Sequence, residues 1–425
     1  MKSCTNVGAL MDEALAYVHA AGLALKQPSG SLPTPFDYLT WADACTVYNP
    51  DAEIRGEILD LRSKLIHRAH QTRRAARNVD SFAAARNRVL GVLLDDARAG
   101  YPELLHTMAF PPDAGFHPSS QLQSADVFTR AIVLEVLAHA SARGYISCPS
   151  ILGLGTDYLV RARRRDAPGG WSYFPGLLEL PGDLDTLSQI AMTLHACRRD
   201  DLLAAHVTDV FAHYCAENTD GNFETWIYSS LNSVASVQRH WAEQAWGIGS
   251  DTEVVAHAIH AMRTIDAHRF GDAVAKMQNV LVRNHSDGQW TSTWYHGPLY
   301  GPYVAARALH GSENFVKIID ETCRVLFKSQ NADGGWGIEF DSSDALSTAY
   351  AVLALYWSGR KSSESCSRGR DYLEACIEDG RFLAEVPFIR MDLGRARHCN
   401  GPILNYASST ITAAYVAMAL MSIAE

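Results

Sequence analysis

Three features found in many proteins are absent from this chain of 425 residues. No apolar run approaches the ~18 residues that a membrane-spanning helix needs. The N-terminus leads into a polar amphipathic pattern and not into the apolar core of a secretion signal. An excess of positive charge is also missing: the net charge of −10 opposes nucleic-acid binding, which uses a basic surface. We therefore expect a cytoplasmic globular protein that binds no nucleic acid.

Paired cysteines are lacking as well. The nine cysteines form no Cys-x-x-Cys pair, and their spacings match no zinc site. They are Cys4, Cys45, Cys148, Cys197, Cys215, Cys323, Cys366, Cys376 and Cys399. An odd, scattered set of this kind is typical of reduced thiols in a cytoplasmic protein.

What the chain does contain is a repeat. The clearest copy runs from Gln330 to Trp336 through Asp-Gly-Gly and leads into an apolar helix that begins near Asp344. Weaker copies recur every ~45 to 70 residues, each with a polar turn that ends in an aromatic residue. The turn aromatics are Phe116, Trp171, Phe223, Trp290, Trp336 and Phe382. Six helical hairpins cannot bury their apolar faces alone, but they can when they stack in a ring.

The second helix of each copy is rich in alanine and apolar on more than one face, which is typical of helices packed on both sides. These segments are 125–137, 183–194, 251–262, 303–309, 344–355 and 408–420. Five of the six begin with Asp, Ser or Thr or just beside one, as helix starts commonly do. The preceding helices carry more charge. The pattern predicts an all-α fold, an (α/α)6 toroid with an inner and an outer ring, over residues 106–425.

Residues 1–105 lie outside the predicted repeat and form an N-terminal helical extension. Two amphipathic stretches, Leu10–Leu25 and Glu53–Ala97, could cover the ring as a lid. The run Arg62–Arg77 is locally basic, which fits either a peripheral membrane or anionic head-group contact or simply a solvated helix face. A helper subunit could cover the ring in place of such a lid.

The clearest copy of the turn resembles a known motif. Gln330, Gly334 and Trp336 match Gln-x-x-x-Gly-x-Trp, the core of the QW motif of the squalene–hopene cyclase, terpene cyclase and prenyltransferase superfamily. Gly169–Trp171, Asp220–Phe223 and Asp287–Trp290 are similar to degenerate copies. The resemblance covers roughly residues 105–425. It implies an α/α toroid, an isoprenoid substrate, and a structural role for the Gln and Trp, which tie outer helices together.

A candidate acid lies at the start of the second inner helix. In family members that cyclise by protonation, an Asp-x-Asp-Asp motif at such a start supplies the general acid, and here Asp183, Leu184 and Asp185 are followed by Thr186. The resemblance implies Asp185 as the acid and Asp183 as its partner. A second carboxylate and hydrogen-bond donors are how a dry site separates such pKa values. Taken alone, the residues also fit a helix cap followed by a first-turn Asp.

Parallel inner helices would bring their N-termini to one mouth of the ring. The carboxylates expected there, besides the candidate acid pair, are Asp126, Asp251, Glu253, Asp341 and Asp344, with His257 as a nearby hydrogen-bond partner. Such a ring of carboxylates could hold a proton, extend into solvent, or bind Mg²⁺ that carries a diphosphate substrate.

Aromatic side chains are frequent near the same mouth. The candidate substrate-binding residues are Trp226, Tyr228, Trp246, Trp294, Tyr295, Tyr303, Phe340 and Tyr406. Aromatic faces stabilise carbocations, as terpene cyclisation requires, although large aromatics also fill cores. We read the chain as a terpene cyclase-like enzyme. The alternatives are an accessory prenyl-binding toroid that needs a partner subunit, and a carbohydrate-active (α/α)6 enzyme whose aromatics stack on sugars.

Overall fold

The computed structural model describes residues 82–424, except 111, 113–114, 119–120, 165–168, 220, 229–232, 340–341 and 393–402. Candidate residue Phe340, together with Asp341 and the basic run Arg62–Arg77, therefore lies outside the described residues. The chain divides into two compact units, Met1–Arg77 with Pro102–Asp126, and Asn78–Tyr101 with Val127–Glu425. The described part of the first unit contains the 3₁₀ turn η1 (Pro102–Leu104) and an antiparallel hairpin of β1 (His106–Ala109) and β2 (Leu122–Ala125).

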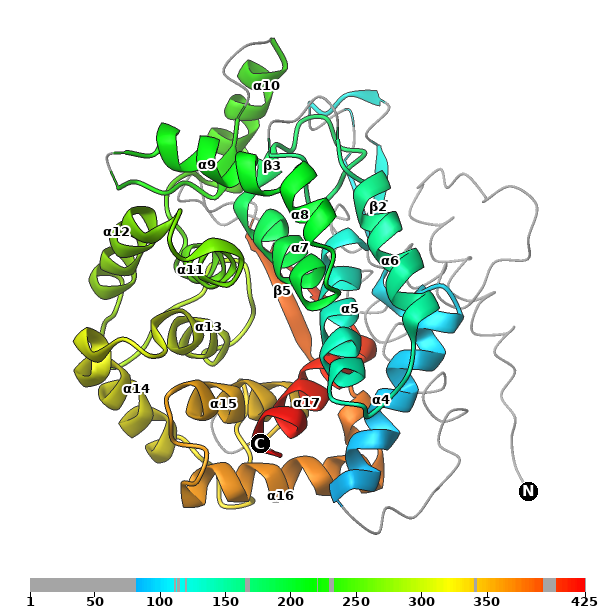
Figure 1. Ribbon diagram of the computed structural model, residues 1–425, viewed down its shortest axis with the longest axis vertical. Coiled ribbons are helices and arrows are strands. Elements are labelled where there is room, and N and C mark those ends of the chain that lie inside the picture. The colour runs from blue at the N-terminus through cyan, green and yellow to red at the C-terminus, as the bar shows by residue number, and fades with distance from the viewer. Residues whose placement is uncertain are drawn as a thin grey trace, which may run out of the picture. The chain divides into compact units, whose positions relative to one another are not determined.

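The second unit is a closed double ring of helices (Figure 1). Six inner helices follow one another around the ring, each packing against the next, and the last packs back on the first. They are α5 (Val127–Ala142), α7 (Leu184–Ala196), α11 (Thr252–Asp266), α13 (Tyr300–Leu309), α15 (Ala345–Trp357) and α17 (Ser409–Ile423). The predicted inner helices and the (α/α)6 toroid are confirmed.

The outer helices alternate with the inner ones along the chain. They are α4 (Phe82–Arg98), α6 (Pro149–Arg161), α8 (Asp200–His206) with α9 (Thr208–Glu217), α12 (Gly271–Arg283), α14 (Val316–Lys328) and α16 (Glu364–Asp379). Each buries mainly one face: α14, for example, buries Thr322, Cys323 and Leu326. In contrast, α15 buries every residue from Ala345 to Leu355, as expected between two layers.

The first outer helix, α4, lies within residues 1–105, which the sequence assigns to an extension. It packs against α16, α17 and α5, and Val89, Leu90 and Leu93 are completely buried. The ring therefore begins about 25 residues earlier than the predicted boundary at residue 106. Helix α4 was left out of the predicted ring because no turn of the repeat type precedes it. The role of the remaining residues 1–81 as an extension or lid stays a prediction.

Short elements fill the connections. They are β3 (Gly182–Asp183), β4 (Trp226–Ile227), α10 (Ser233–Trp241), the π-helical turn η4 (Ala242–Trp246), the 3₁₀ turns η5 (Glu313–Phe315) and η6 (Arg381–Leu383), β5 (Pro387–Asp392) and β6 (Ile403–Ala407). β3 pairs with β4, and β5 pairs with β6, both antiparallel. The six cysteines among the described residues are all free, four of them buried.

Three turn tryptophans repeat the same contact. The indole N–H of Trp171, Trp290 and Trp336 donates to Leu159, Leu281 and Leu326 respectively, at 2.8, 2.8 and 2.9 Å. Each acceptor is the carbonyl two residues before the end of the preceding outer helix, where carbonyls have no partner within the helix. The indole therefore satisfies a helix end and anchors the turn.

Gln330 links this turn to the next outer helix. Its side-chain amide donates to the Gly334 carbonyl at 2.8 Å and to the Ser365 carbonyl in the first turn of α16 at 2.9 Å. Gly334 has φ of +90°, a conformation that strongly favours glycine. The Gln-x-x-x-Gly-x-Trp motif thus ties α14 to α16 at one corner of the ring.

Candidate functional site

The two candidate carboxyls lie at the start of α7. Asp183 is the N-cap residue: its Oδ1 accepts the Thr186 N–H at 2.6 Å, and its Oδ2 accepts the Tyr173 N–H at 3.0 Å. Asp185 follows in the first turn of the helix. Both are buried, at 5% and 9% exposure, so two carboxyls share a space that water hardly reaches.

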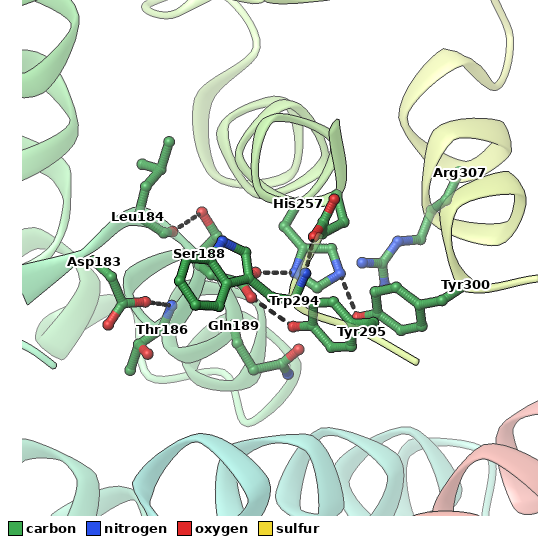
Figure 2. Close-up of polar contacts among 12 residues, drawn as sticks. Asp183, Leu184, Thr186, Ser188, Gln189, His257, Trp294, Tyr295, Tyr300 and Arg307 are labelled. Atoms are coloured by element: carbon green, nitrogen blue, oxygen red, sulfur yellow. Dashed lines mark hydrogen bonds and ion pairs between the residues drawn. The ribbon is translucent and has the colours of Figure 1, made fainter. Parts of the chain in front are cut away.

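Asp185 hydrogen-bonds to two residues far away in the sequence, His257 and Tyr295, both of which are labelled in Figure 2. Its Oδ1 is bonded to His257 Nδ1, and its Oδ2 accepts the Tyr295 hydroxyl at 2.5 Å. The opposite ring nitrogen of His257, Nε2, lies 2.8 Å from the Tyr300 hydroxyl. Tyr295 and Tyr300 stack with ring centroids 3.7 Å apart, which holds both hydroxyls in place. His257, predicted as a partner of an acidic neighbour, is thus in contact with the predicted acid.

The two carboxyls have different hydrogen-bond partners. Burial raises the pKa of Asp183 to about 7, and the nearby Asp185 adds to the rise, while the hydrogen bonds from Thr186 and Tyr173 oppose it. Asp185 lacks these backbone donors and has instead a hydroxyl and an imidazole. Hydrogen-bond donors of this kind stabilise the charged form of a carboxylate.

The two carboxyls face an apolar cavity of about 60 Å³. Its lining comes from five parts of the ring and is aromatic or aliphatic apart from the two Asp residues and one Thr: Phe128, Tyr173, Phe174, Leu180, Asp183, Asp185, Thr225, Trp226, Trp246, Val254, Trp294, Ile389 and Met391. Trp226 and Trp294 meet edge to face with centroids 5.6 Å apart. The site therefore places two buried carboxyls beside aromatic side chains, whose faces can attract a cation.

Only some of the predicted aromatics line this cavity. Trp226, Trp246 and Trp294 do, and Tyr295 contacts the acid itself. Tyr228 instead lies on a neighbouring polar pocket, beneath Arg239. Tyr303 is buried on α13, where its hydroxyl contacts Met418 and Arg307, and Tyr406 is buried in β6.

The predicted acidic residues are dispersed. Asp251 and Glu253 lie together at the start of α11, where both bond to Trp294. Asp344 caps α15 through the Ser347 N–H at 2.7 Å, and Asp126 belongs to the first compact unit. Among the described residues, no three His, Cys, Asp or Glu side chains are placed to hold a metal ion. Magnesium binding, one of the three possibilities for these carboxylates, stays a prediction.

Several site residues were not predicted from the sequence. Tyr173 follows the Trp171 turn by two residues and donates its N–H to Asp183. Ile389 and Met391 come from β5, a strand that the sequence analysis missed. The alternation of Ile389, Arg390 and Met391 is a strand signal, but it occupies a short insertion within a helical repeat. Tyr300 begins α13, three residues before the predicted start.

An α/α ring whose buried carboxyl pair faces an aromatic cavity defines the class of the terpene-cyclase-like toroids. Residues 151–389, more than half of the chain, match the squalene-hopene cyclase C-terminal domain family. The chain belongs to this family, as the QW motif indicated.

The curated relatives are terpene cyclases. Drimenyl diphosphate synthase of Streptomyces showdoensis is 27% identical over 203 residues, which are 46% of this chain and 34% of the relative. Squalene–hopene cyclase of Bradyrhizobium diazoefficiens is 23% identical over 231 residues, 49% of this chain and 34% of the relative. The chain thus spans about a third of the length of these relatives.

Solved structures share the fold at low identity. A variant of the type II terpene cyclase MstE from Scytonema, in complex with geranylgeranyl dihydroxybenzoate, has a TM-score of 0.57 and 17% identity, with 81% of this chain and 97% of that chain covered. A protein from Actinoplanes has a TM-score of 0.56 at 17% identity, with 81% and 100% covered. Within the described residues, no helix is both long and apolar enough to cross a bilayer.

Proposed function

We propose that this chain is a terpene cyclase-like enzyme that begins the cyclisation of an isoprenoid by protonating a carbon–carbon double bond, with Asp185 as the acid. The observation that carries the proposal is the position of Asp185, which faces an apolar aromatic cavity while His257 and Tyr295 hydrogen-bond to its two oxygens. The proposal is supported by the names of the relatives, which include diphosphate synthases and squalene–hopene cyclases.

The first step moves one proton and no other atom. The O–H bond of Asp185 breaks, and a C–H bond forms at one alkene carbon, which leaves a carboxylate on the enzyme and a cation on the substrate. His257 and Tyr295 stabilise that carboxylate because both are placed at its oxygens. The next double bond of the substrate then closes a ring on the cation. The cyclised cation finally releases a proton to water, and Asp185 takes a proton back from solvent, so the reaction is a net isomerisation.

Aromatic side chains in the walls of the cavity can stabilise the cation. Trp226 and Trp294 contribute indole faces, and Phe128 and Phe174 contribute phenyl rings. A cation over such a face gains roughly 0.5 to 2 kcal/mol per contact, most where water is excluded. None of the described residues that line the cavity carries an amide side chain, which favours a hydrocarbon substrate over a sugar.

The size of the cavity limits how the substrate enters. About 60 Å³ holds roughly two water molecules, whereas small-molecule sites usually measure about 300–1,000 Å³. Wall side chains must therefore move when an isoprenoid binds. We expect the substrate to be a prenyl diphosphate or a prenylated compound. Magnesium is expected only with a diphosphate, and none of these steps depends on it.

Asp185→Asn tests the proposal, because an amide keeps the shape of the side chain but cannot deliver the proton. Wild type and variant are incubated with geranyl, farnesyl and geranylgeranyl diphosphate and with squalene, and the products are analysed by mass spectrometry. We expect a loss of at least ~10³-fold in turnover with an unchanged melting temperature.

Two further variants bracket this result. Asp183→Asn should slow turnover less, since Asp183 tunes its neighbour and caps α7. Asp200→Asn, an exposed first-turn Asp on the outer helix α8, should have no effect. Undiminished product formation by Asp185→Asn would reject Asp185 as the acid, whereas no product from either the wild type or the variant would favour an accessory prenyl-binding toroid.

A further inference from the structure

Trp294 is held at two points by carboxyls from the start of α11 (Figure 2 labels Trp294 and the residue that follows it, Tyr295). Its indole N–H donates to Asp251 Oδ2 at 2.7 Å, and its backbone N–H donates to Glu253 Oε1 at 2.7 Å. The two bonds fix the side chain and the main chain of one residue that lines the cavity.

Asp251 is used differently from the other helix-start residues. Asp183, Asp344 and Ser408 each accept a backbone N–H from their own helix. Asp251 occupies the N-cap position of α11 but makes no such bond. Its Oδ2 instead accepts the Thr225 hydroxyl and the Trp294 indole, both at 2.7 Å. Capping stabilises a helix, so a side chain that forgoes the cap has a different role here.

Glu253 is also buried at a cost in free energy. It is completely buried; its Oε1 accepts the N–H groups of Thr293 and Trp294 at 2.7 Å each, while Oε2 has no hydrogen-bond partner among the described residues. Burial, reinforced by Asp251, raises the pKa of Glu253 to about 8. Burying a carboxyl with one oxygen unsatisfied is unfavourable, and what the fold gains in return is a fixed main chain at Thr293 and Trp294.

That main chain leads directly to the candidate acid. Tyr295, the next residue, donates its hydroxyl to Asp185. On the other side, Thr225 accepts the Leu184 N–H at 2.9 Å through its carbonyl, and Leu184 lies between the two candidate carboxyls. Asp251 and Glu253 therefore connect the aromatic wall to both the start of α7 and the donor on Asp185.

We propose that Asp251 and Glu253 are positioning residues that fix Trp294 and Tyr295 relative to Asp185 and thereby determine which cyclic product forms. The inference rests on the proposed function. A cation is guided by the aromatic face nearest to it, and a displacement of ~1 Å in a reacting site can change rates ~10²-fold. Loss of either carboxyl therefore changes the partition between products as well as the overall rate.

The test compares Glu253→Leu with Glu253→Gln, and Asp251→Leu with Asp251→Asn. Gln and Asn keep a side-chain oxygen that can accept from the same donors, whereas Leu removes it. One readout is amide hydrogen exchange over Thr293–Tyr295, and the other is the product ratio with the three prenyl diphosphates and squalene. We expect at least tenfold faster exchange in Glu253→Leu, an altered product ratio in both Leu variants, and values near wild type for Gln and Asn.

A matched control separates positioning from stability. Ser363 caps the outer helix α16 through the Cys366 N–H at 3.2 Å, so Ser363→Ala should lower the melting temperature without changing exchange at Thr293–Tyr295 or the product ratio. Folded Leu variants with unchanged exchange and unchanged products would overturn the inference.

A second variant keeps the test valid if the Leu variants do not fold. Trp294→Phe removes the indole donor but leaves an aromatic ring, and it should shift the product ratio as Asp251→Leu does, with no further shift when the two are combined. An unchanged ratio in Trp294→Phe would overturn the role of Asp251. The exchange measurement does not depend on catalysis and therefore tests the role of Glu253 independently. An Asp185→Asn variant that stays active would reject the proposed function but leave the role of Glu253 to the exchange result.

Discussion

Asp183 and Asp185 carry the same functional group two residues apart, yet their partners differ. Asp183 accepts two backbone N–H groups, and Asp185 is bonded to His257 and to the hydroxyl of Tyr295. The Thr186 donor belongs to the helix start itself, whereas the imidazole comes from α11 and the hydroxyl from the segment before α13. The chemical difference between the two carboxyls is therefore a property of the assembled ring.

Tyr295→Phe should lower the activity while preserving the fold. The variant removes the hydroxyl that donates to Asp185 Oδ2 but keeps the ring that stacks on Tyr300. A hydrogen bond to a charged group contributes about 1.5–3 kcal/mol, which corresponds to a rate loss of roughly 10- to 100-fold. Steady-state kinetics measure this loss. Tyr372→Phe, which removes a hydroxyl bonded to the Ser343 carbonyl, is the control, and equal rates in both variants would contradict the role of Tyr295.

Glu253 should make the stability depend on pH. Its pKa is about 8 in the folded protein, against an ordinary value of 4.5. The folded state therefore binds more protons between these values, so the contribution to stability is complete at low pH and is lost as the pH rises through about 8. Relative to Glu253→Gln, the wild type should lose up to about 1.4 kcal/mol of unfolding free energy per pH unit between pH 4.5 and about 8, with a shallower slope near each end.

Urea unfolding of the wild type and Glu253→Gln at several pH values measures the difference. Asp183, whose pKa is also raised, is present in both proteins and cancels. Parallel stability curves would show that Glu253 does not retain its proton in the folded state.

At the scale of elements, helix starts and turns place the site. α13 begins with Tyr300, which contacts His257, and the next residue, Gly301, lies against the Trp290 turn. A Cβ on Gly301 would lie 2.1 Å from the Trp290 carbonyl oxygen, far inside contact distance. The turn that anchors an outer helix thus also sets the position of an inner one.

Gly301→Ala should displace the start of α13. Overpacking of this kind costs about 1–3 kcal/mol, and because Tyr300 is adjacent, the activity should fall as well. Gly271→Ala is the matched control, since nothing lies within 4 Å of a Cβ built at that helix start. Thermal unfolding and product assays compare the two. A Gly301→Ala protein as stable as Gly271→Ala would show that α13 can shift without cost.

At the scale of the whole molecule, the ring is closed by α17 packing on α5, with α4 as the first outer helix. A ring has no free helix at its edge, so the loss of one member exposes the apolar faces of two neighbours. The ring therefore depends on residues that precede the matched family region by more than fifty positions.

Two deletions separate the ring from the segment before it. Removing residues 1–100 deletes α4 with Val89, Leu90 and Leu93, each of which contributes ~1.5–3 kcal/mol when fully buried. We expect this protein not to fold. Removing residues 1–81 keeps α4 and should leave a folded ring by circular dichroism.

The second deletion also tests the predicted lid. If residues 1–81 cover the apolar cavity, the truncated protein should bind a hydrophobic dye more strongly than the full chain and be less soluble. A soluble, monomeric protein that does not bind the dye would place the cover elsewhere.

Much of the fold could be predicted from the sequence because a repeat encodes burial locally. Apolar residues on several faces distinguish the inner helices from the outer ones, and the predicted starts near Asp183, Asp251, Asp344 and Ser408 agree with the observed helices. The β5–β6 hairpin was missed because it interrupts the repeat, and α4 was misplaced because no turn of the repeat type precedes it.

The sequence by itself determined the ring, its family and the carboxyl pair at the start of α7, since each depends on patterns among residues that are close together in the chain. Only the tertiary structure decided the partners of that pair. His257 lies 72 residues from Asp185, and Tyr295 lies 110 residues away. Neither spacing predicts a contact, because helices distant in sequence meet only when the ring closes. The position of Asp251 predicts a helix cap, but in the folded ring its side chain accepts the buried indole N–H of Trp294 and not a backbone N–H of α11.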